Sequence, residues 1–347
     1  MEWDWYSQLP EELEAAMKER GEKAFRGRQI FTWLHRKHAS SFAEMTDLRA
    51  ELRERLQAEA PLQPLRIVQK QTSKTGEART GKYLMELADG KRIETVLMEY
   101  SYGYSVCISS QVGCRMGCRF CASTLNGLER NLSAGEMLQQ IYTVEREEAV
   151  EISHVVVMGC GEPFDNYEQL MRFLQLIHHS EGKNLSLRNI TVSTCGLTAR
   201  IREFADQKLG VTLAVSLHAA EDETRKQIMR VAQGVSMAEL MQACRYYTEQ
   251  THRRLTFEYA LIRGVNDSPA QAEKLAALLR GMLCHVNLIP INPVTECGLG
   301  RPERETVRRF QTILEERHIP VTLRREMGSD IDAACGQLRA RKQQQMR

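Results

Sequence analysis

Three cysteines stand close together in one short segment, Cys114-Arg-Met-Gly-Cys118-Arg-Phe-Cys121. No fourth cysteine or histidine lies near them in the sequence, whereas a closed structural zinc site takes four ligands. Cube-type iron–sulfur clusters usually take four cysteines as well, so three thiolates would leave one iron open to a small molecule. The same spacing also follows one face of a helix, and three buried core cysteines are the alternative interpretation. Because Gly113, Gly117 and two arginines disfavour a buried helix, the segment is predicted to bind metal.

The chain has 347 residues, of which 10 are cysteines. Its first residues are acidic and aromatic, unlike a signal peptide, which predicts a cytoplasmic protein. Stable disulfides are rare in that compartment, so some of the cysteines are expected to serve metal binding or catalysis. Cys244 and Cys284 are predicted to be small buried hydrophobes. Taken alone, Cys107 fits a buried strand cysteine better than a catalytic one.

Composition limits the possible classes of protein. Hydrophobic residues make up 42% and charged residues 27%, which excludes a disordered tail, a fibre and a coiled coil. No apolar run approaches the ~20 residues of a membrane span, so no membrane association is expected. With 47 basic and 45 acidic residues, any RNA-binding surface must be local. The basic and aromatic segment 23–28 is one candidate, for which a solvated helix face is the favoured explanation.

The hydrophobic periodicity changes along the chain and predicts several parts. Apolar residues at helical spacing indicate helices over 9–20, 24–37 and 41–56, and alternation indicates hairpin strands over 82–87 and 92–98. The predicted division is a helical accessory domain (1–60), a β-hairpin extension (61–100), an α/β domain (101–338) and a basic C-terminal tail (339–347).

From residue 105 onward, strand and helix patterns alternate, which predicts an α/β fold with a parallel sheet or barrel. The candidate strands are 105–110, 153–158, 189–194, 211–217, 256–262, 285–291 and 320–324. These units are too few for a full eightfold barrel, so a partial (β/α)6 barrel is expected. Functional groups of such barrels lie at the carboxyl ends of the strands.

Seven further motifs follow one another along the chain: 107–114, 159–163, 192–196, 216–218, 264–267, 287–292 and 330–338. They include Gly159-Cys-Gly-Glu-Pro163 and Ser216-Leu-His218. Together with the three cysteines after the first strand of the α/β series, these motifs resemble the radical SAM superfamily, where SAM is S-adenosylmethionine. Within it they resemble the RlmN/Cfr family of RNA methyltransferases. The resemblance covers nearly the whole chain, including the N-terminal helical unit.

The resemblance implies two cofactors, a [4Fe–4S] cluster and SAM. Cys114, Cys118 and Cys121 would hold the cluster, and SAM would bind its fourth iron. The other SAM contacts that the resemblance assigns are Gly161, Glu162, Ser193, Ser216, Leu217, His218 and Asn292. A carboxylate at Glu162 suits the SAM ammonium group. The family commonly has Met or Ile where Cys160 stands and Ser where Cys195 stands; since cysteine is similar in size, SAM binding is expected to survive.

The reaction that the resemblance implies is methylation of adenine C2 in 23S rRNA, at the peptidyl-transferase centre, and in tRNA, at the adenosine 3′ of the anticodon. This carbon is electron-poor, so ordinary methyl displacement from SAM fails there and a carbon radical is needed. In the family, one SAM methylates the counterpart of Cys335, and a second SAM yields a radical that takes hydrogen from the S-methyl group. The methylene radical then bonds to C2, and a base removes the C2 proton. That base matches Glu94, with Cys107 as the alternative. Finally Cys107 attacks the sulfur of Cys335, which releases methylated RNA and leaves a disulfide.

The implied partners are 23S rRNA, tRNA and an electron donor such as flavodoxin, with a monomer expected. RNA contacts are expected from the helical unit, the hairpin and arginines such as Arg324 and Arg325. Two alternatives are an adenine-C8 methyltransferase of the antibiotic-resistance (Cfr) type and a zinc-stabilised RNA-binding protein without catalysis.

Overall fold

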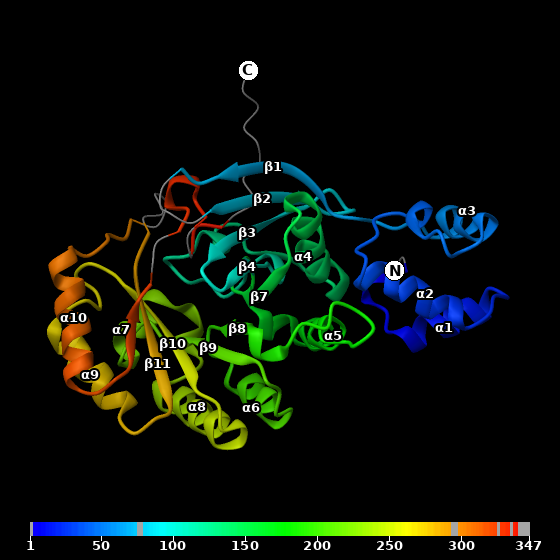
Figure 1. Cartoon of the computed structure of the whole chain (residues 1–347). Helices are drawn as coiled ribbons and strands as arrows, with labels where there is room; N and C mark the ends of the chain where they lie inside the picture. The colour runs from blue at the N-terminus through cyan, green and yellow to red at the C-terminus, as the bar shows by residue number, and fades with distance from the viewer. Residues whose placement is uncertain (1–2, 75–78, 293–297, 325–326, 334–335, 339–347) are drawn as a thin grey trace.

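The N-terminal part of the chain is helical. The computed structural model describes residues 3–74, 79–292, 298–324, 327–333 and 336–338; the predicted sites at Arg325 and Cys335 and the tail at 339–347 lie outside these ranges. Helices α1 (Pro10–Glu19), α2 (Phe25–His35) and α3 (Ala50–Glu59) follow a short 3-10 turn at Trp5–Ser7. They pack beside the larger α/β part (Figure 1).

The predicted helix over 41–56 is wrong for residues 41–49. The chain instead forms a 3-10 turn at Phe42–Glu44, and helix α3 begins only at Ala50. The Glu44 carboxylate accepts hydrogen bonds from the backbone N–H and the hydroxyl groups of both Ser40 and Ser41. These short-range bonds stabilise a turn in place of a continuous helix.

Ten strands form one mixed sheet in the order β1-β2-β3-β4-β7-β8-β9-β10-β11-β12. Pairs from β1 to β4 are antiparallel, and pairs from β4 onward are parallel. The strands are β1 (Arg66–Thr72), β2 (Thr80–Glu86), β3 (Arg92–Tyr100), β4 (Gly103–Cys107), β7 (Ile152–Val157), β8 (Ile190–Thr194), β9 (Thr212–Ser216), β10 (Leu255–Leu261), β11 (Cys284–Pro290) and β12 (Val321–Leu323). A separate pair joins β5 (Gln111–Gly113) to β6 (Leu128–Asn131).

Helices follow the parallel strands, which confirms the predicted partial α/β barrel (Figure 1). They are α4 (Ala134–Glu148), α5 (Tyr167–Ile177), α6 (Thr198–Asp206), α7 (Asp222–Ile228), α8 (Met237–Thr251), α9 (Pro269–Leu279) and α10 (Arg304–Glu316). Six strands, β4 and β7 to β11, are each followed by a helix, and β12 is a seventh parallel strand. None of the helices in the described ranges has the length and apolar character of a membrane span.

The predicted hairpin strands are present as β2 and β3, whereas β1 was not predicted. The sequence of β1, Arg66-Ile-Val-Gln-Lys-Gln-Thr72, is mostly polar and most of its residues are exposed at the edge of the sheet. Because the strand buries little, it lacks the apolar alternation by which strands are recognised.

Buried polar groups join the helical unit to the barrel. The His35 imidazole Nδ1 lies 3.1 Å from the Tyr142 hydroxyl, and the His38 ring stacks on Tyr142. The His38 Nδ1 lies 3.2 Å from a Glu145 carboxylate oxygen. Burial lowers the pKa of His35 to about 3 and that of His38 to about 4, and the Lys183 ammonium lowers the pKa of His38 further. Both histidines are therefore neutral at pH 7.

These histidines predict a loss of stability in acid. An unfolded histidine has a pKa of about 6.5, so between about pH 6.5 and pH 4 the unfolded chain binds protons that the folded chain does not. The free energy of unfolding should therefore fall as pH decreases through this window. His38→Asn, which tolerates the positive φ at this position, should reduce that slope, as measured by urea unfolding at several pH values. His154→Asn, outside the interface, is the control, and an unchanged slope in His38→Asn would contradict the prediction.

Candidate active site

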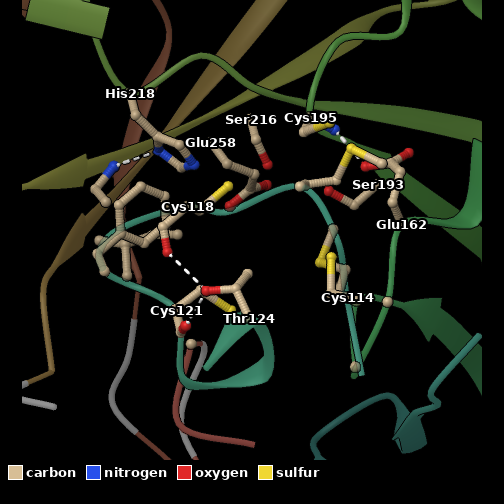
Figure 2. Close-up of a pocket in the computed structure, with 18 of the residues that line it drawn as sticks. Cys114, Cys118, Cys121, Thr124, Glu162, Ser193, Cys195, Ser216, His218 and Glu258 are labelled. Carbon is tan, nitrogen blue, oxygen red and sulfur yellow. Dashed lines mark hydrogen bonds between the residues drawn. The ribbon is translucent and has the colours of Figure 1, made fainter. Parts of the chain in front are cut away.

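One cavity lies at the carboxyl ends of the parallel strands (Figure 2). Its lining includes all three predicted cluster cysteines and six of the seven predicted SAM contacts: Cys114, Cys118, Cys121, Gly161, Glu162, Ser193, Ser216, His218 and Asn292. Leu217 is the exception, because its side chain is fully buried in the core and does not line the cavity. Groups from strands far apart in sequence thus share one space.

Backbone contacts hold the cysteine loop in place. The Cys114 N–H donates to the Gly127 carbonyl (2.9 Å), and the Arg119 N–H donates to the Ile228 carbonyl at the end of α7 (2.9 Å). Gly113 has φ +77°, and a Cβ there would lie 2.0 Å from the Gly127 oxygen. This position therefore excludes every side chain, which explains one of the glycines that marked the loop in the sequence. The Thr124 hydroxyl donates to the carbonyls of Cys118 and Cys121.

The three thiols favour a bound cation. Burial raises the pKa of Cys114 to about 12. The pKa of Cys118 is raised by burial and also by the neighbouring Cys121, Cys114 and Glu162. Thiolates here need a positive charge, and a coordinated metal supplies one and deprotonates the thiols that bind it. Because thiolate is the ligand of iron–sulfur clusters, this donor set fits such a cluster.

The turn after β7 brings a carboxylate into the cavity. Gly161 has φ +111°, and a Cβ there would lie 2.6 Å from the Cβ of Gln111, so the close approach of two chain segments requires glycine. The Gln111 side-chain oxygen accepts from the Glu162 N–H. The Glu162 carboxylate accepts from the N–H groups of Phe164 (3.0 Å) and Cys195 (2.7 Å). Burial raises its pKa and these bonds oppose the rise; the oriented carboxylate is suited to an ammonium group.

His218 is a neutral donor. Its Nδ1 accepts a hydrogen bond from the Ala260 N–H (2.9 Å), so the proton is assigned to Nε2. Burial lowers its pKa to about 3, with Arg225 lowering it further. The Phe120 ring packs edge-on against the imidazole, with 4.7 Å between ring centres. The histidine thus presents a fixed N–H beside the cysteine loop.

Sequence reasoning included the 264–267 motif but assigned no role to Asn266. This side chain is fully buried. Its amide nitrogen donates to the carbonyls of His218 and Ala260 (both 2.7 Å), and its oxygen accepts from the Ile262 N–H (2.7 Å). Asn266 therefore connects the His218 loop to the end of β10. The asparagine in the 264–267 motif was the sequence signal from which this role could have been predicted.

Arg225 on α7 was missed, and nothing in its sequence surroundings pointed to it. The side chain is fully buried, and its guanidinium donates to the carbonyls of Cys195, Ser216 and Leu217. Among the described residues, no carboxylate lies within ion-pair distance of it. Burial lowers its pKa, and the nearby thiols of Cys195 and Cys118 oppose that change. Arg225 thus holds the ends of β8 and β9 beside the cysteine loop.

Two of the predicted catalytic residues, Glu94 and Cys107, do not line the cavity. Glu94 on β3 is buried, with a carboxylate oxygen 3.3 Å from the Lys82 ammonium. Cys107 ends β4 and is buried in a cluster with Val96 and Leu338. The Ala122 N–H donates to the Gly336 carbonyl (2.7 Å), so the described residues on the C-terminal side of position 335 lie near both Cys107 and the cysteine loop.

The other cysteines occupy different environments. Cys195 lines the cavity, whereas Cys160 does not. Burial raises the pKa of Cys160 to about 11. Cys244 and Cys284 are buried among apolar side chains, which confirms the prediction for them.

Two family models match the chain. Residues 8–62 match the ribosomal RNA large subunit methyltransferase N-terminal domain, and residues 108–276 match the radical SAM superfamily.

Several relatives match nearly the full length. A probable dual-specificity RNA methyltransferase RlmN from Lachnoclostridium phytofermentans is 51% identical, over 95% of this chain and 92% of the relative. The corresponding protein of Bacillus subtilis is 49% identical over 98% of this chain and 93% of its own length. The crystal structure of a radical SAM methyltransferase from Sphaerobacter thermophilus has a TM-score of 0.93 and 47% identity, covering 97% of this chain and 99% of that one.

The bonds of Asn266 predict a large cost for its removal. Asn266→Ala would leave the Ile262 N–H and two carbonyls buried without partners, at roughly 1–3 kcal/mol each. The free energy of unfolding should therefore fall by about 3 kcal/mol or more, measured by urea denaturation. Asn189→Ala is the control, since among the described residues the Asn189 side-chain amide donates a single bond, to the Ser153 carbonyl. Equal losses in the two variants would argue against this role for Asn266.

Proposed function

The chain belongs to the RlmN family of radical SAM RNA methyltransferases, and we propose that it methylates C2 of adenine in 23S rRNA and in tRNA. The rRNA target is at the peptidyl-transferase centre, and the tRNA target is the adenosine 3′ of the anticodon. The observation that carries this proposal is the single cavity that combines three thiols with a buried carboxylate and a neutral histidine. Membership of this family excludes the hypothesis of an RNA-binding protein without catalysis.

Cys114, Cys118 and Cys121 would hold a [4Fe–4S] cluster in this cavity. Gly161, Glu162, Ser193, Ser216, His218 and Asn292 would bind SAM, the first two at its amino group. Among the described residues, the side chains of Ser193, Ser216 and Asn292 make no hydrogen bond, so their polar atoms are available to a ligand. When bound, the cluster and SAM would supply the carbon radical that activates the methyl group.

The remaining chemistry belongs to residues of the chain. Cys335 carries the methyl group on its sulfur, and the methyl carbon becomes bonded to adenine C2. Glu94 then accepts the C2 proton, with Cys107 as the alternative acceptor. The Cys107 thiolate attacks the sulfur of Cys335, a sulfur–sulfur bond forms, and the sulfur–carbon bond to the RNA breaks. The carbon keeps the electron pair of that bond and takes up a proton, which completes the methyl group on C2. The contacts of Ala122 and Ser123 with Gly336 and Leu338 support a position of residues 336–338 near Cys107.

RNA must reach this buried chemistry, so the target adenine would leave its base stack. We assign RNA contact to the helical accessory domain (1–60), the hairpin extension (61–100) and Arg324. The electron donor would be a flavodoxin-type protein, and the enzyme would act as a monomer.

The product tests the position of methylation. Protein purified without oxygen should be brown, contain about four irons per chain, and convert adenosine in 23S rRNA and tRNA to 2-methyladenosine, as identified by mass spectrometry of the nucleosides. Cys118→Ala should lose iron and activity, whereas Cys244→Ala, a core cysteine outside the cavity, should keep both. Formation of 8-methyladenosine would assign the chain to the Cfr-type reaction instead.

The role of Cys107 predicts a trapped intermediate. Cys107→Ala should accumulate a covalent RNA–protein adduct, because release of the RNA needs attack by this thiol. The adduct would appear as a slower protein band that ribonuclease removes. Cys284→Ala is the matched control, as another buried strand cysteine. Normal turnover by Cys107→Ala without an adduct would contradict the assignment.

A further inference from the structure

A buried carboxylate in the cavity has no role in the steps above. Glu258 lies on β10, paired with Ser216 of β9 on one side and Asn287 of β11 on the other. It lines the cavity together with Ala260, whereas the alternate residue Tyr259 packs against Phe310 of α10. Figure 2 shows the Glu258 side chain near Ser216 and His218. The strand thus presents a carboxylate on the face that a ligand would contact.

The two oxygens of this carboxylate differ in their partners. Oε1 accepts a hydrogen bond from the Asn287 amide (2.9 Å). Oε2 is buried and accepts no hydrogen bond from the described residues. The Arg324 Nη1 lies 3.7 Å from it, beyond hydrogen-bond distance. Burial raises the pKa of Glu258, while Arg324 and Asn287 oppose the rise. A buried acceptor without a donor is costly, so Oε2 is suited to a donor that a ligand brings.

The position of Glu258 indicates which donor this is. Glu162, the proposed partner of the SAM ammonium, is bonded to the loop after β8 through the Cys195 N–H. Glu258 lies two strands further, on β10, which is roughly 10 Å at the usual strand spacing. Ser193 on β8 and Ser216 on β9 line the space between them. A ligand with its amino-acid end at Glu162 therefore extends its nucleoside end towards Glu258.

We propose that Glu258 Oε2 accepts a hydrogen bond from a ribose hydroxyl of SAM and makes Glu258 a specificity-determining residue for the nucleoside half. This inference rests on the proposed use of SAM. Carboxylates bind ribose hydroxyls in the same way in dinucleotide sites. The hydroxyl would complete the carboxylate's hydrogen bonds without adding a second charge to the interior.

The test is SAM binding to the iron-loaded protein, measured by equilibrium dialysis without oxygen. The ligands are SAM and its 2′-deoxy and 3′-deoxy analogues, and the proteins are wild type, Glu258→Gln and Glu258→Ala. The wild type should bind one deoxy analogue roughly tenfold more weakly than SAM, as expected for a charge-assisted hydrogen bond. Glu258→Ala should bind SAM about tenfold more weakly and lose the discrimination, since this variant and the deoxy analogue remove the same bond. Glu258→Gln keeps a neutral acceptor, so it should lose only the part of the affinity that comes from the charge.

Glu145→Gln is the matched control, because Glu145 is also buried but lies at the interface with the helical unit. It should bind SAM and both analogues as the wild type does. A wild type that binds both deoxy analogues as tightly as SAM overturns the inference even if the variants do not fold. Equal discrimination in wild type and folded Glu258→Ala also overturns it. Failure of the iron-loaded wild type to bind SAM at all would instead overturn the proposed function on which the inference rests.

Discussion

The geometry of the site depends on the hydrogen bonds that buried backbone groups form at the carboxyl ends of the parallel strands. Beyond the last ladder bond, N–H and C=O groups have no strand partner, yet they lie beneath the cavity and need hydrogen bonds. The Glu162 carboxylate accepts from the Cys195 N–H, and the Arg225 guanidinium donates to the Cys195 carbonyl. Asn266 does the same for the loop that carries His218. The side chains that hold the cavity loops in position are therefore also the ones that satisfy the backbone groups at the ends of the strands.

A second network of hydrogen bonds connects the carboxyl ends of the parallel strands to the antiparallel strands. The Gln140 side chain on α4 accepts from the Ser109 N–H (2.8 Å) and the Thr95 hydroxyl (2.9 Å). The Ser109 hydroxyl donates to the Glu94 carbonyl and accepts from the Cys160 N–H. One buried amide and one hydroxyl thus link β3, the loop after β4 and the turn after β7. The proposed proton acceptor and the proposed SAM-binding turn are consequently fixed relative to each other through neutral groups that do not titrate.

The sequence predicted the parallel strands well, because each is a short apolar run bounded by turn residues. Of the described residues that the resemblance assigned to the site, the three cluster cysteines and six SAM contacts line one cavity, whereas Leu217, Glu94 and Cys107 do not. The hydrophobic periodicity and the motifs could not predict the roles of Arg225, Gln140 and Glu258. Each has a hydrogen-bond partner far away in the sequence: Arg225 donates to Cys195, 30 residues away, Gln140 accepts from Ser109, 31 residues away, and Glu258 accepts from Asn287, 29 residues away. The local sequence does not reveal these contacts. The exposed strand β1 was missed for the opposite reason, because it buries too little to leave an apolar pattern.

The charged groups around the cavity destabilise the protein when no ligand is bound. Burial raises the pKa of Glu162 and of the Cys114 and Cys118 thiols and lowers that of Arg225, so in each case the surroundings disfavour the charged form. A core selected for stability would replace such groups with apolar ones of similar volume. Their presence is explained if bound ligands compensate these charges, with a cation beside the Glu162 carboxylate and metal beside the thiols. The positive charge of Arg225 lies near Cys118 and Cys195, where it favours thiolates over thiols. The cavity is therefore arranged for ligands that carry positive charge, and the hydrogen bonds at the strand ends keep these groups in place before the ligands bind.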